Sequence, residues 1–367
     1  MSKYLFIVQG EGRGHLTQAI SLAQILQQNG HEVVQVLVGV GEGRQLPTFF
    51  TQQIQAPVQT FHSPHLMMGK KGISFAKTIG YHLFRLWRYV RSVAKIKSIV
   101  RAQSPDVIVN FYDVLGGIYA FLYRSNIPLV AVGHHYLFFH PEMIFPQKRG
   151  LDHWLLKINT YITALQAEKL LALSFQFFQD QPQSRIVVTP PLLRQAVHGL
   201  YPTQQNYLLA YVTYTSLSNN IVQWHLQNPT IPLHCFWDNA QYNEEYVYDE
   251  TLTFHQVDGQ KYLQMMADCK ALVTTAGFES VCEAMYLGKP VMMVPAHYEQ
   301  ACNALDAQKA GAGVAADTFD LSILLDYLPQ HQLIQDSFQH WCSQASAIFL
   351  QHLEEVVGEK QVLVGFS

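Results

Sequence analysis

Polar residues between Leu272 and Ala304 have the types and the spacing of a site for a phosphate and a ribose. Gly277 ends a short apolar run and precedes a helical segment. Its turn is therefore expected at a helix N-terminus, where unpaired backbone N–H groups and the helix dipole favour an anion. Thr275 and Ser280 flank this turn and add hydroxyl groups. Glu283 follows Ser280 by three residues and shares its helix face, where a carboxylate could bind ribose hydroxyls.

The elements that must position these residues form one βαβ unit. The apolar run before Gly277 predicts a buried strand, the segment after it predicts a helix, and residues 291–295 predict a second buried strand. Glu299 and Gln300 follow this second strand. Because the carboxyl ends of parallel strands meet at one edge of a sheet, we expect this pair near the Gly277 turn.

At these positions the chain resembles the nucleotide-sugar glycosyltransferases of the GT-B fold, which include UDP-glycosyltransferases and peptidoglycan-type glycosyltransferases. The residues that match their donor signature, in order, are Gly277, Ser280, Glu283, Gly288, Pro290, Glu299, Gln300, Asn303 and Ala304. The resemblance implies that Thr275 and Ser280 contact a diphosphate and that Glu283 binds the ribose. It also implies that Glu299 and Gln300 bind the hydroxyls of the sugar.

The signature has two departures. Plant-type members carry His at the position of Thr275 and Asn at the position of Glu279, so the contacts to the diphosphate need not be identical. The residues alone also leave an alternative open, in which the βαβ unit is purely structural and Glu283 and Glu299 are merely solvated.

A second glycine-rich turn, GEGRGH, spans residues 10–15 between a predicted strand and a predicted helix. Its spacing differs from the G-x-G-x-x-G of dinucleotide sites, and no acidic residue closes the following strand. Gly12 and Gly14 are instead typical of a backbone that lies close to a substrate or phosphate. His15 could take a proton from an acceptor hydroxyl as a general base, and the resemblance places a catalytic His here. The alternative is a His that only caps the helix.

Three more polar residues are expected at the same edge of the first sheet. Asp113 ends the strand predicted over residues 105–113. In the superfamily an acidic residue in this region orients the catalytic His, and Asp113 held against His15 would fix its tautomer and stabilise the imidazolium. His134 and His135 end the strand predicted over residues 127–135 and are candidates for contact with the acceptor. A hydrogen-bonded core or loop residue is the alternative for each His.

The resemblance implies two further contacts with the donor. Ser216 ends the strand predicted over residues 206–216, at the position that contacts phosphate in the family. Its alternative role is to cap the next helix. The backbone near Phe254 and Val257, in the strand predicted over residues 252–259, is expected to pair with the nucleotide base.

The length of 367 residues allows two α/β domains with a large buried core. We predict an N-terminal acceptor-binding domain over residues 1–192 and a C-terminal nucleotide-sugar-binding domain over residues 193–330. A closing helix over residues 331–367 is expected to cross back to the first domain. The five cysteines show no metal-ligand spacing, which favours reduced thiols in a cytoplasmic protein. The N-terminal apolar run is too short for a signal peptide, and no run reaches the about 20 residues of a membrane span.

Charge is distributed unevenly along the chain. Between Gly43 and Pro105 lie ten Lys and Arg residues and no Asp or Glu, although the whole chain has a net charge of −3. One face of a predicted helix carries four of these cations, Arg85, Arg88, Arg91 and Lys95. This face predicts docking to anionic lipid headgroups at the inner face of the membrane, or to another anionic acceptor. An ordinary amphipathic helix with solvated cations is the alternative, and the overall charge argues against nucleic acid as a partner.

The sequence therefore predicts two doubly wound, Rossmann-like α/β domains that face a central cleft, the GT-B architecture. The implied reaction transfers a sugar from a UDP-sugar to an unknown acceptor, with a lipid-linked acceptor among the candidates and His15 as the base. We expect no metal, because no Asp-x-Asp pair is present, and no cofactor besides the donor substrate. Two alternatives stay open: a sugar-nucleotide epimerase or hydrolase on the same fold, and a non-catalytic protein that binds the nucleotide-sugar.

Overall fold

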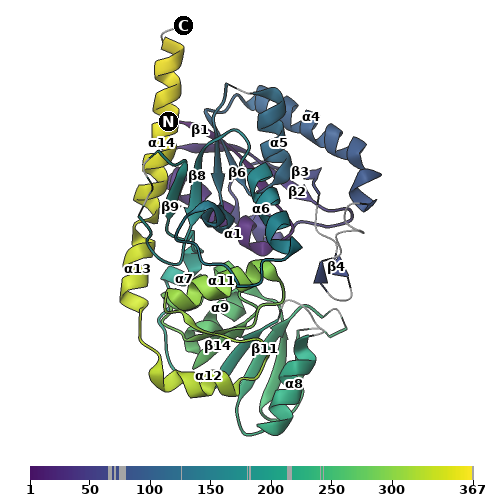
Figure 1. The fold of residues 1–367 in the computed structure, drawn as a ribbon, viewed down its shortest axis with the longest axis vertical. Helices are drawn as coiled ribbons and strands as arrows, with labels where there is room; N and C mark the ends of the chain where they lie inside the picture. The colour runs from purple at the N-terminus through teal and green to yellow at the C-terminus, as the bar shows by residue number, and fades with distance from the viewer. Residues whose placement is uncertain are drawn as a thin grey trace. The chain divides into compact units, whose positions relative to one another are not determined.

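The protein is described from a computed structural model of the full chain (Figure 1). The structure describes residues 1–64, 68–69, 72–73, 80–124, 126–179, 181, 183–212, 217–239, 241–242 and 244–365. The chain divides into two compact units. The first comprises Met1–Met143, Gly150–Arg194 and Cys342–Ser367, and the second comprises Ile144–Arg149 and Gln195–Trp341.

A parallel sheet of seven strands lies at the centre of the first unit. In spatial order its strands are β3 (Val58–His62), β2 (Glu32–Val40), β1 (Lys3–Gln9), β6 (Val107–Phe111), β7 (Leu129–Val132), β8 (Ala167–Leu173) and β9 (Ile186–Thr189). The central strands are continuous apolar runs that are buried on both faces, which is the pattern of a parallel sheet covered by helices on each side. A two-stranded antiparallel pair, β4 (Met68–Gly69) and β5 (Gly72–Ile73), is separate from this sheet.

The chain leaves the centre of this sheet in both directions. From β1 it continues to β2 and β3 on one side, and from β6 it continues to β7, β8 and β9 on the other, so the switch point lies between β1 and β6. Right-handed crossovers then place the helices of the two halves on opposite faces. One face is covered by α1 (Arg13–Gln28) and α2 (Thr48–Gln53), and the other by α4 (Leu86–Gln103), α5 (Val114–Tyr123) and α6 (Leu151–Thr163).

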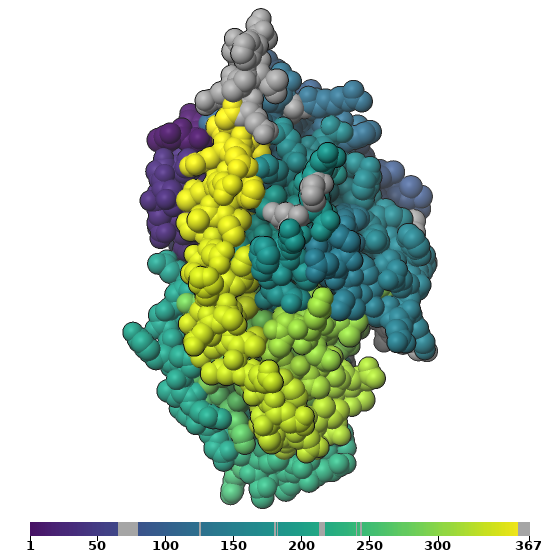
Figure 2. Space-filling model, turned by 60° about the vertical axis from the view of Figure 1, so that its left-hand side comes forward, coloured from purple at the N-terminus to yellow at the C-terminus, as the bar shows by residue number. Residues whose placement is uncertain are grey.

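The last helix also belongs to the first unit. α14 (Ala345–Gly365) packs against β6, β8 and β9, and Figure 2 shows it in yellow along the surface of this unit. Lys169 of β8 forms an ion pair with Glu355 of this helix. Among the described helices, none combines the length and the apolar character that crossing a bilayer requires.

The second unit repeats the arrangement with a sheet of seven strands. In spatial order these are β12 (Glu245–Val247), β13 (Leu252–Gln256), β11 (Leu233–Trp237), β10 (Leu208–Tyr211), β14 (Ala271–Thr274), β15 (Val291–Met293) and β16 (Gly313–Ala315). β12 pairs antiparallel with β13, and the other pairs are parallel. The switch point lies between β10 and β14, because β11 and β13 continue on one side and β15 and β16 on the other.

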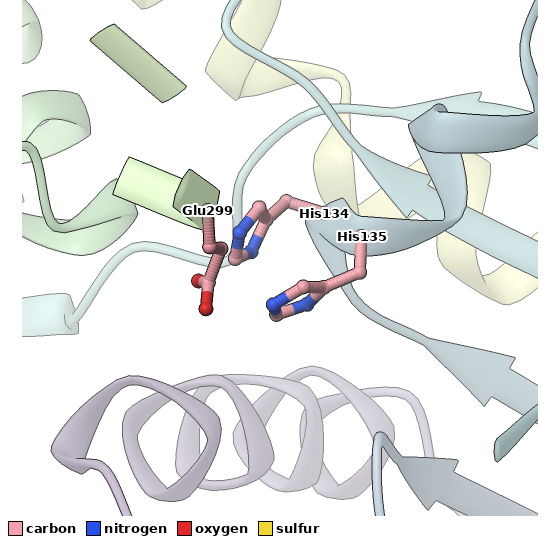
Figure 3. A group of neighbouring side chains, drawn as sticks. All are labelled: His134, His135 and Glu299. Atoms are coloured by element: carbon pink, nitrogen blue, oxygen red, sulfur yellow. The ribbon is translucent and has the colours of Figure 1, made fainter. Parts of the chain in front are cut away.

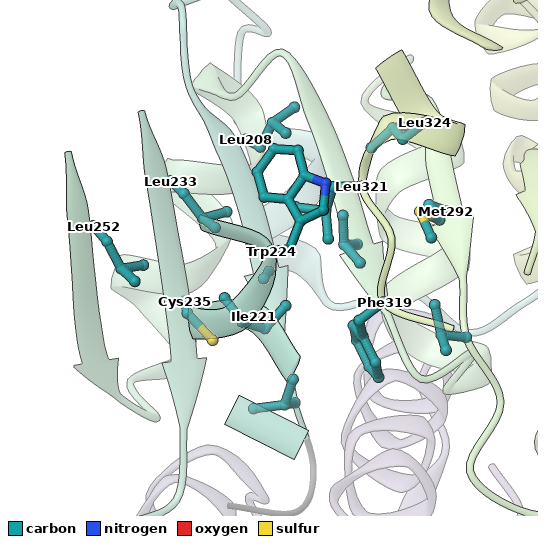
Figure 4. Packing of buried hydrophobic residues seen from close by; sticks show 14 of the residues in the cluster. Leu208, Ile221, Trp224, Leu233, Cys235, Leu252, Met292, Phe319, Leu321 and Leu324 are labelled. Atoms are coloured by element: carbon teal, nitrogen blue, oxygen red, sulfur yellow. The ribbon is translucent and has the colours of Figure 1, made fainter. Parts of the chain in front are cut away.

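Helices also precede, connect and follow these strands in the chain. They are α7 (Gln195–His198), α8 (Ser218–Gln227), α9 (Gly259–Asp268), α10 (Phe278–Tyr286), α11 (Tyr298–Lys309), α12 (Ser322–Tyr327) and α13 (Gln335–Ser343). Figure 4 shows Ile221 and Trp224 of α8 packed against strand residues such as Leu208 and Leu233, with Phe319, Leu321 and Leu324 in the same cluster. This buried apolar surface supplies the main stabilisation of the unit.

The predicted fold class is confirmed, because each unit is a doubly wound, Rossmann-like α/β sheet. The predicted βαβ unit corresponds to β14, α10 and β15, followed by α11. The chain passes from the first unit to the second after Arg194, and residues 144–149, inside the predicted N-terminal domain, belong to the second unit.

Candidate functional site

The turn between β14 and α10 contains a residue in the left-handed conformation. Ala276 has a φ of 62°, which costs a non-glycine residue about 1–2 kcal/mol. The side chain of Asn303, from α11, donates a hydrogen bond to the Ala276 carbonyl oxygen at 3.2 Å. Strain of this kind persists only where neighbouring groups fix the backbone, and it occurs frequently at ligand sites.

A second side chain of α11 holds the same turn. Gln300 is buried, its Nε2 donates to Thr275 Oγ1 at 3.3 Å, and its Oε1 accepts from the backbone N–H of Ala296 at 2.9 Å. We predicted Gln300 at the sugar hydroxyls. The structure shows that its amide also ties the β14–α10 turn to the loop after β15.

The space beside Gly277 is open. This residue is the N-cap of α10, has a φ of −65° and has no side-chain capping bond. A Cβ atom built on it would have no other heavy atom within 4 Å. Neither the backbone conformation nor packing therefore requires glycine here. The open space lies at a helix N-terminus, where backbone N–H groups attract an anion.

The remaining donor-side candidates surround this turn in the fold of the second unit. Ser280 lies half-buried in the first turn of α10, and Glu283 follows one turn later with only 1% of its surface exposed. Glu299, labelled in Figure 3, lies half-buried in the first turn of α11. All three follow the carboxyl ends of β14 or β15, which is the edge where doubly wound sheets bind ligands.

The two residues that we predicted beside the nucleotide base have different environments. Val257 is half-buried in the loop between β13 and α9, where Asp258 caps α9 by accepting from two backbone N–H groups. Phe254 is 1% exposed and stacks on Trp237, with ring centroids 4.3 Å apart, so its side chain belongs to the core. Ser216 lies outside the described residues.

In the first unit, the turn after β1 ends at a second open helix N-terminus. Gly10 donates its N–H to Gly39 O at 2.8 Å, and a Cβ on Gly10 would lie 2.7 Å from that oxygen, so only glycine allows this close approach. Gly12 is the N-cap of α1 without a side-chain capping bond. Gly14 is the second residue of α1.

His15 follows in the first turn of α1 and is 8% exposed. Its Nδ1 lies 3.2 Å from Oε1 of Gln18, one turn along the same helix. This contact lies within the first turns of α1 and can hold the orientation of the imidazole ring. The hydrogen bond of Asp113, the partner that we predicted for His15, goes instead to the backbone of α5.

Asp113 has a structural role at the end of β6. It is fully buried and caps α5, because its Oδ1 accepts from the backbone N–H of Leu115 at 2.8 Å. Its Oδ2 has no hydrogen-bond partner among the described residues. Burial raises the pKa of Asp113 to about 6, although the Ser63 hydroxyl and backbone N–H groups of α5 oppose this shift.

Tyr112 joins the predicted histidines of the first unit in one stack. Its ring lies 3.8 Å from that of His135 at an interplanar angle of 13°, and 5.5 Å from that of His15. Its hydroxyl lies 2.7 Å from Thr160 Oγ1, and its φ of 60° is in the left-handed region. His134 and His135, which begin η1 (His134–Phe139), lie side by side with ring centroids 3.9 Å apart (Figure 3).

We did not predict two residues of this cluster, Gln18 and Tyr112. Gln18 had a visible signal, because it follows His15 by three residues and therefore shares its helix face. Tyr112 had none, since an aromatic residue at the end of a buried strand is more often part of the core.

The four predicted cations of α4 and its N-cap are only partly available to a ligand. Arg85 and Arg88 form ion pairs with Glu42, which precedes the acid-free segment, at 3.2 and 2.7 Å. These bonds, with one from Tyr81, lower the pKa of Glu42 to about 2. Lys95 Nζ donates to Thr60 O at 2.7 Å. Arg91 is exposed, with its guanidinium 4.5 Å from the centre of the Trp87 ring.

Comparison with known proteins identifies the family to which this chain belongs. The profile of glycosyl transferase family 1 matches residues 2–330. Among curated proteins, no sequence matches the chain. Among solved structures, the calicheamicin glycosyltransferase CalG4 is similar with a TM-score of 0.63 at 15% identity, and the alignment covers 97% of this chain and 98% of that one.

Two further structures support the same fold. UGT2 of Phytolacca americana, solved with UDP-2-fluoro-glucose and pterostilbene, has a TM-score of 0.64 at 12% identity, with 98% of this chain and 100% of that one covered. MurG of Acinetobacter baumannii has a TM-score of 0.56 at 16% identity, with 98% and 100% covered. The chain therefore belongs to glycosyl transferase family 1 and is a sugar transferase of the GT-B fold.

Proposed function

We propose that the protein transfers a hexose from a UDP-sugar to a hydroxyl group of an acceptor, with the donor bound by the second unit and the acceptor by the first. One observation carries this proposal: the turn at Ala276 and Gly277 is strained, is held in place by α11, and leaves open space at the N-terminus of α10. A backbone fixed in a costly conformation beside open space is typical of a preorganised ligand site.

The donor diphosphate is expected against the backbone N–H groups at the N-terminus of α10, with hydroxyl contacts from Ser280 and Thr275. Ser216 is a further proposed contact. The buried carboxylate of Glu283 would bind the ribose, Val257 would lie beside the base, and Glu299 with Gln300 would contact the sugar. The similarity to a structure that contains UDP-2-fluoro-glucose supports a uridine donor.

His15 is the proposed general base. Its imidazole would take the proton of the acceptor hydroxyl while that oxygen attacks the anomeric carbon, and the contact with Gln18 supports a fixed orientation of the ring. The bond to the UDP oxygen breaks in the same reaction, and the charge that develops on the diphosphate is stabilised by the helix dipole and the N–H groups of α10. We propose that this stabilisation replaces a metal, and that activity persists in the presence of EDTA.

The acceptor is proposed to be lipid-linked, and the protein to act in the cytoplasm at the inner face of the membrane. The cations of α4 are the feature that supports an anionic partner, and the five buried free cysteines are compatible with a reducing compartment.

The test is release of UDP from a panel of UDP-sugars with and without a lipid extract. We expect release that depends on the lipid and is lost in His15→Ala. Conversion of the UDP-sugar without any acceptor would contradict the proposal in favour of an epimerase or hydrolase. Binding of UDP without turnover under all conditions would favour a non-catalytic protein.

A further inference from the structure

α6 has an exposed face that is unusually apolar for a surface helix. Its buried residues are His153, Thr160 and Thr163. Its outer face carries an apolar stripe at helical spacing, Leu151, Trp154, Ile158 and Tyr161, with 53% to 65% of each residue exposed. A surface helix normally buries its apolar stripe against the core and turns its polar side to water.

The inward polar face of α6 has a structural explanation. Thr160 Oγ1 bonds to Leu156 O and to the Tyr112 hydroxyl, and Thr163 accepts a bond from the Tyr136 hydroxyl at 3.1 Å. Asn110, at the end of β6, donates to Thr163 O at 2.9 Å. These bonds satisfy the side chains of Thr160 and Thr163. On the outer stripe, the Trp154 ring contacts that of His153 edge to face, with centroids 5.4 Å apart, and all four residues of the stripe stay more than half exposed.

The neighbouring helices extend this surface. α5 packs against both α4 and α6, on the same face of the sheet. The segment that leads into α4 and the first turns of that helix expose Phe84, Trp87 and Val90, and the end of α5 exposes Phe121 and Leu122. Exposed aromatic and aliphatic residues thus recur on all three helices, and clusters of exposed apolar residues typically mark interaction surfaces.

The charges on this surface are predominantly positive. α4 and α5 contain no Asp or Glu, and α6 contains one acidic residue, Asp152. Arg91, Lys97 and Arg124 are exposed on or next to α4 and α5, and Lys97 Nζ lies 4.2 Å from the centre of the Tyr123 ring. A second copy of the chain, docked through the same face, would bring like charges together. An anionic bilayer is complementary to both the cations and the aromatic residues.

We propose that the outer face of α4, α5 and α6 docks on an anionic lipid bilayer, with the α6 stripe inserted among the lipid headgroups and the cations beside them. This deepens the proposed function and rests on it for the role of the membrane, which would present a lipid-linked acceptor to the first unit. The docking itself is independent of turnover. The arginines that pair with Glu42 contribute less to membrane binding than the sequence predicted, and the apolar stripe of α6 contributes more.

The experiment is sedimentation of the full chain with vesicles of phosphatidylcholine alone and of phosphatidylcholine mixed with phosphatidylglycerol. The test variant is Trp154→Ser with Ile158→Ser, and a charge variant is Arg91→Gln with Lys97→Gln. Leu226→Ser with Leu333→Ser, which changes exposed apolar residues of the second unit, is the matched control. Unfolding curves check that all variants fold.

We expect wild type to sediment with the mixed vesicles and the control variant to match it. The α6 variant should bind about tenfold more weakly or worse, because two apolar side chains lose their burial. The charge variant should lose about fivefold per removed cation, on the mixed vesicles only. Equal sedimentation of the α6 variant and wild type would overturn the docking face, as would a wild type that binds neither vesicle. A wild-type dimer that the α6 variant dissociates would assign the face to a second copy instead.

UDP binding separates this proposal from the proposed function. The α6 variant is expected to bind UDP like wild type, because the donor turn lies in the second unit. Vesicle binding by a protein that does not bind UDP would support the docking face and overturn the proposed UDP-sugar donor. A wild type that binds UDP but does not sediment with vesicles would support the proposed donor site and overturn the docking face.

Discussion

Gly277 is a position where the requirements of folding and those of ligand binding can be tested separately. Its φ of −65° suits any residue, and a Cβ would meet no neighbouring atom. We expect Gly277→Ala to leave the free energy of unfolding unchanged or to raise it by about 0.4–1 kcal/mol, since alanine restricts the unfolded chain. The same methyl group would occupy the space proposed for the diphosphate. Calorimetry should therefore show UDP affinity weakened about tenfold or more.

Gly288 provides the matched control, eleven residues further along the chain and just after the end of α10. It has a φ of 66°, and a Cβ on it would lie 2.7 Å from Gln335 Oε1. Gly288→Ala should lower the stability by about 1–2 kcal/mol and leave the UDP affinity of the folded protein unaltered. Equal UDP affinities for wild type and Gly277→Ala would remove the diphosphate from this turn.

Gln18 is expected to act through the protonation of His15. Gln18→Glu would place a carboxylate against Nδ1, which stabilises the imidazolium and raises its pKa. A base must be deprotonated to act, so the acid side of the pH profile of kcat/KM should move upward by about 1 pH unit. Gln18→Ala should lower kcat without such a displacement. Profiles of both variants that superimpose on wild type after scaling would show that Gln18 does not position His15.

For individual residues, the sequence predicted which residue types the candidate site contains but not all of their contacts. His15, His134 and His135 were predicted at one sheet edge, and the structure brings their rings together through Tyr112. Gln300 and Asn303 match a ligand-binding signature, yet both form hydrogen bonds that hold the turn. A residue that binds a ligand and a residue that holds the binding site in shape can occupy the same position of a motif. The motif alone therefore does not distinguish the two roles.

At the scale of elements, α5 begins at Asp113, whose carboxyl group ionises at a higher pH than an ordinary aspartate. The pKa of Asp113 is raised to about 6 from an ordinary value of 3.8. The folded chain therefore holds this proton more tightly than the unfolded chain, and the resulting stability is present below about pH 4 and lost as the pH rises through about 6. The loss amounts to about 3 kcal/mol.

Asp113→Asn tests this dependence and keeps a side chain that caps helices well. The stability of the variant relative to wild type should rise by about 2–2.5 kcal/mol between pH 4 and pH 7, as measured by urea denaturation at a series of pH values. A difference between the two proteins that is constant over this range would show that the carboxylate is ionised in the folded state without penalty.

The helices also show where sequence patterns stop being informative. Residues Leu151–Thr163 form α6. Their apolar stripe could not reveal which side faces the sheet, because periodicity defines a face and not its partner. The inward direction is set by hydrogen bonds from Tyr112, Tyr136 and Asn110, which are distant in the sequence.

At the scale of the whole molecule, the two Rossmann-like units were predictable because most strands are short, largely apolar runs and most of them are followed by a helix. The assignment of residues 144–149 to the second unit was not, since it depends on packing between distant segments. The ion pair of Lys169 with Glu355 likewise joins residues far apart in the chain.

Hydrogen exchange should locate the donor within this architecture. Saturating UDP is expected to slow amide exchange in β14, α10 and the start of α11, because a ligand that binds only the folded state raises the free energy of local opening. The segment around Gly10 to His15 should exchange as before. Protection confined to that segment would assign the nucleotide to the first unit.

The most direct measurement is a crystal structure of the protein with UDP. The account predicts the diphosphate against the N–H groups of Gly277 to Ser280 and the ribose hydroxyls at the Glu283 carboxylate. A nucleotide bound anywhere else, or a β14–α10 turn that stays empty at saturating UDP, would contradict it.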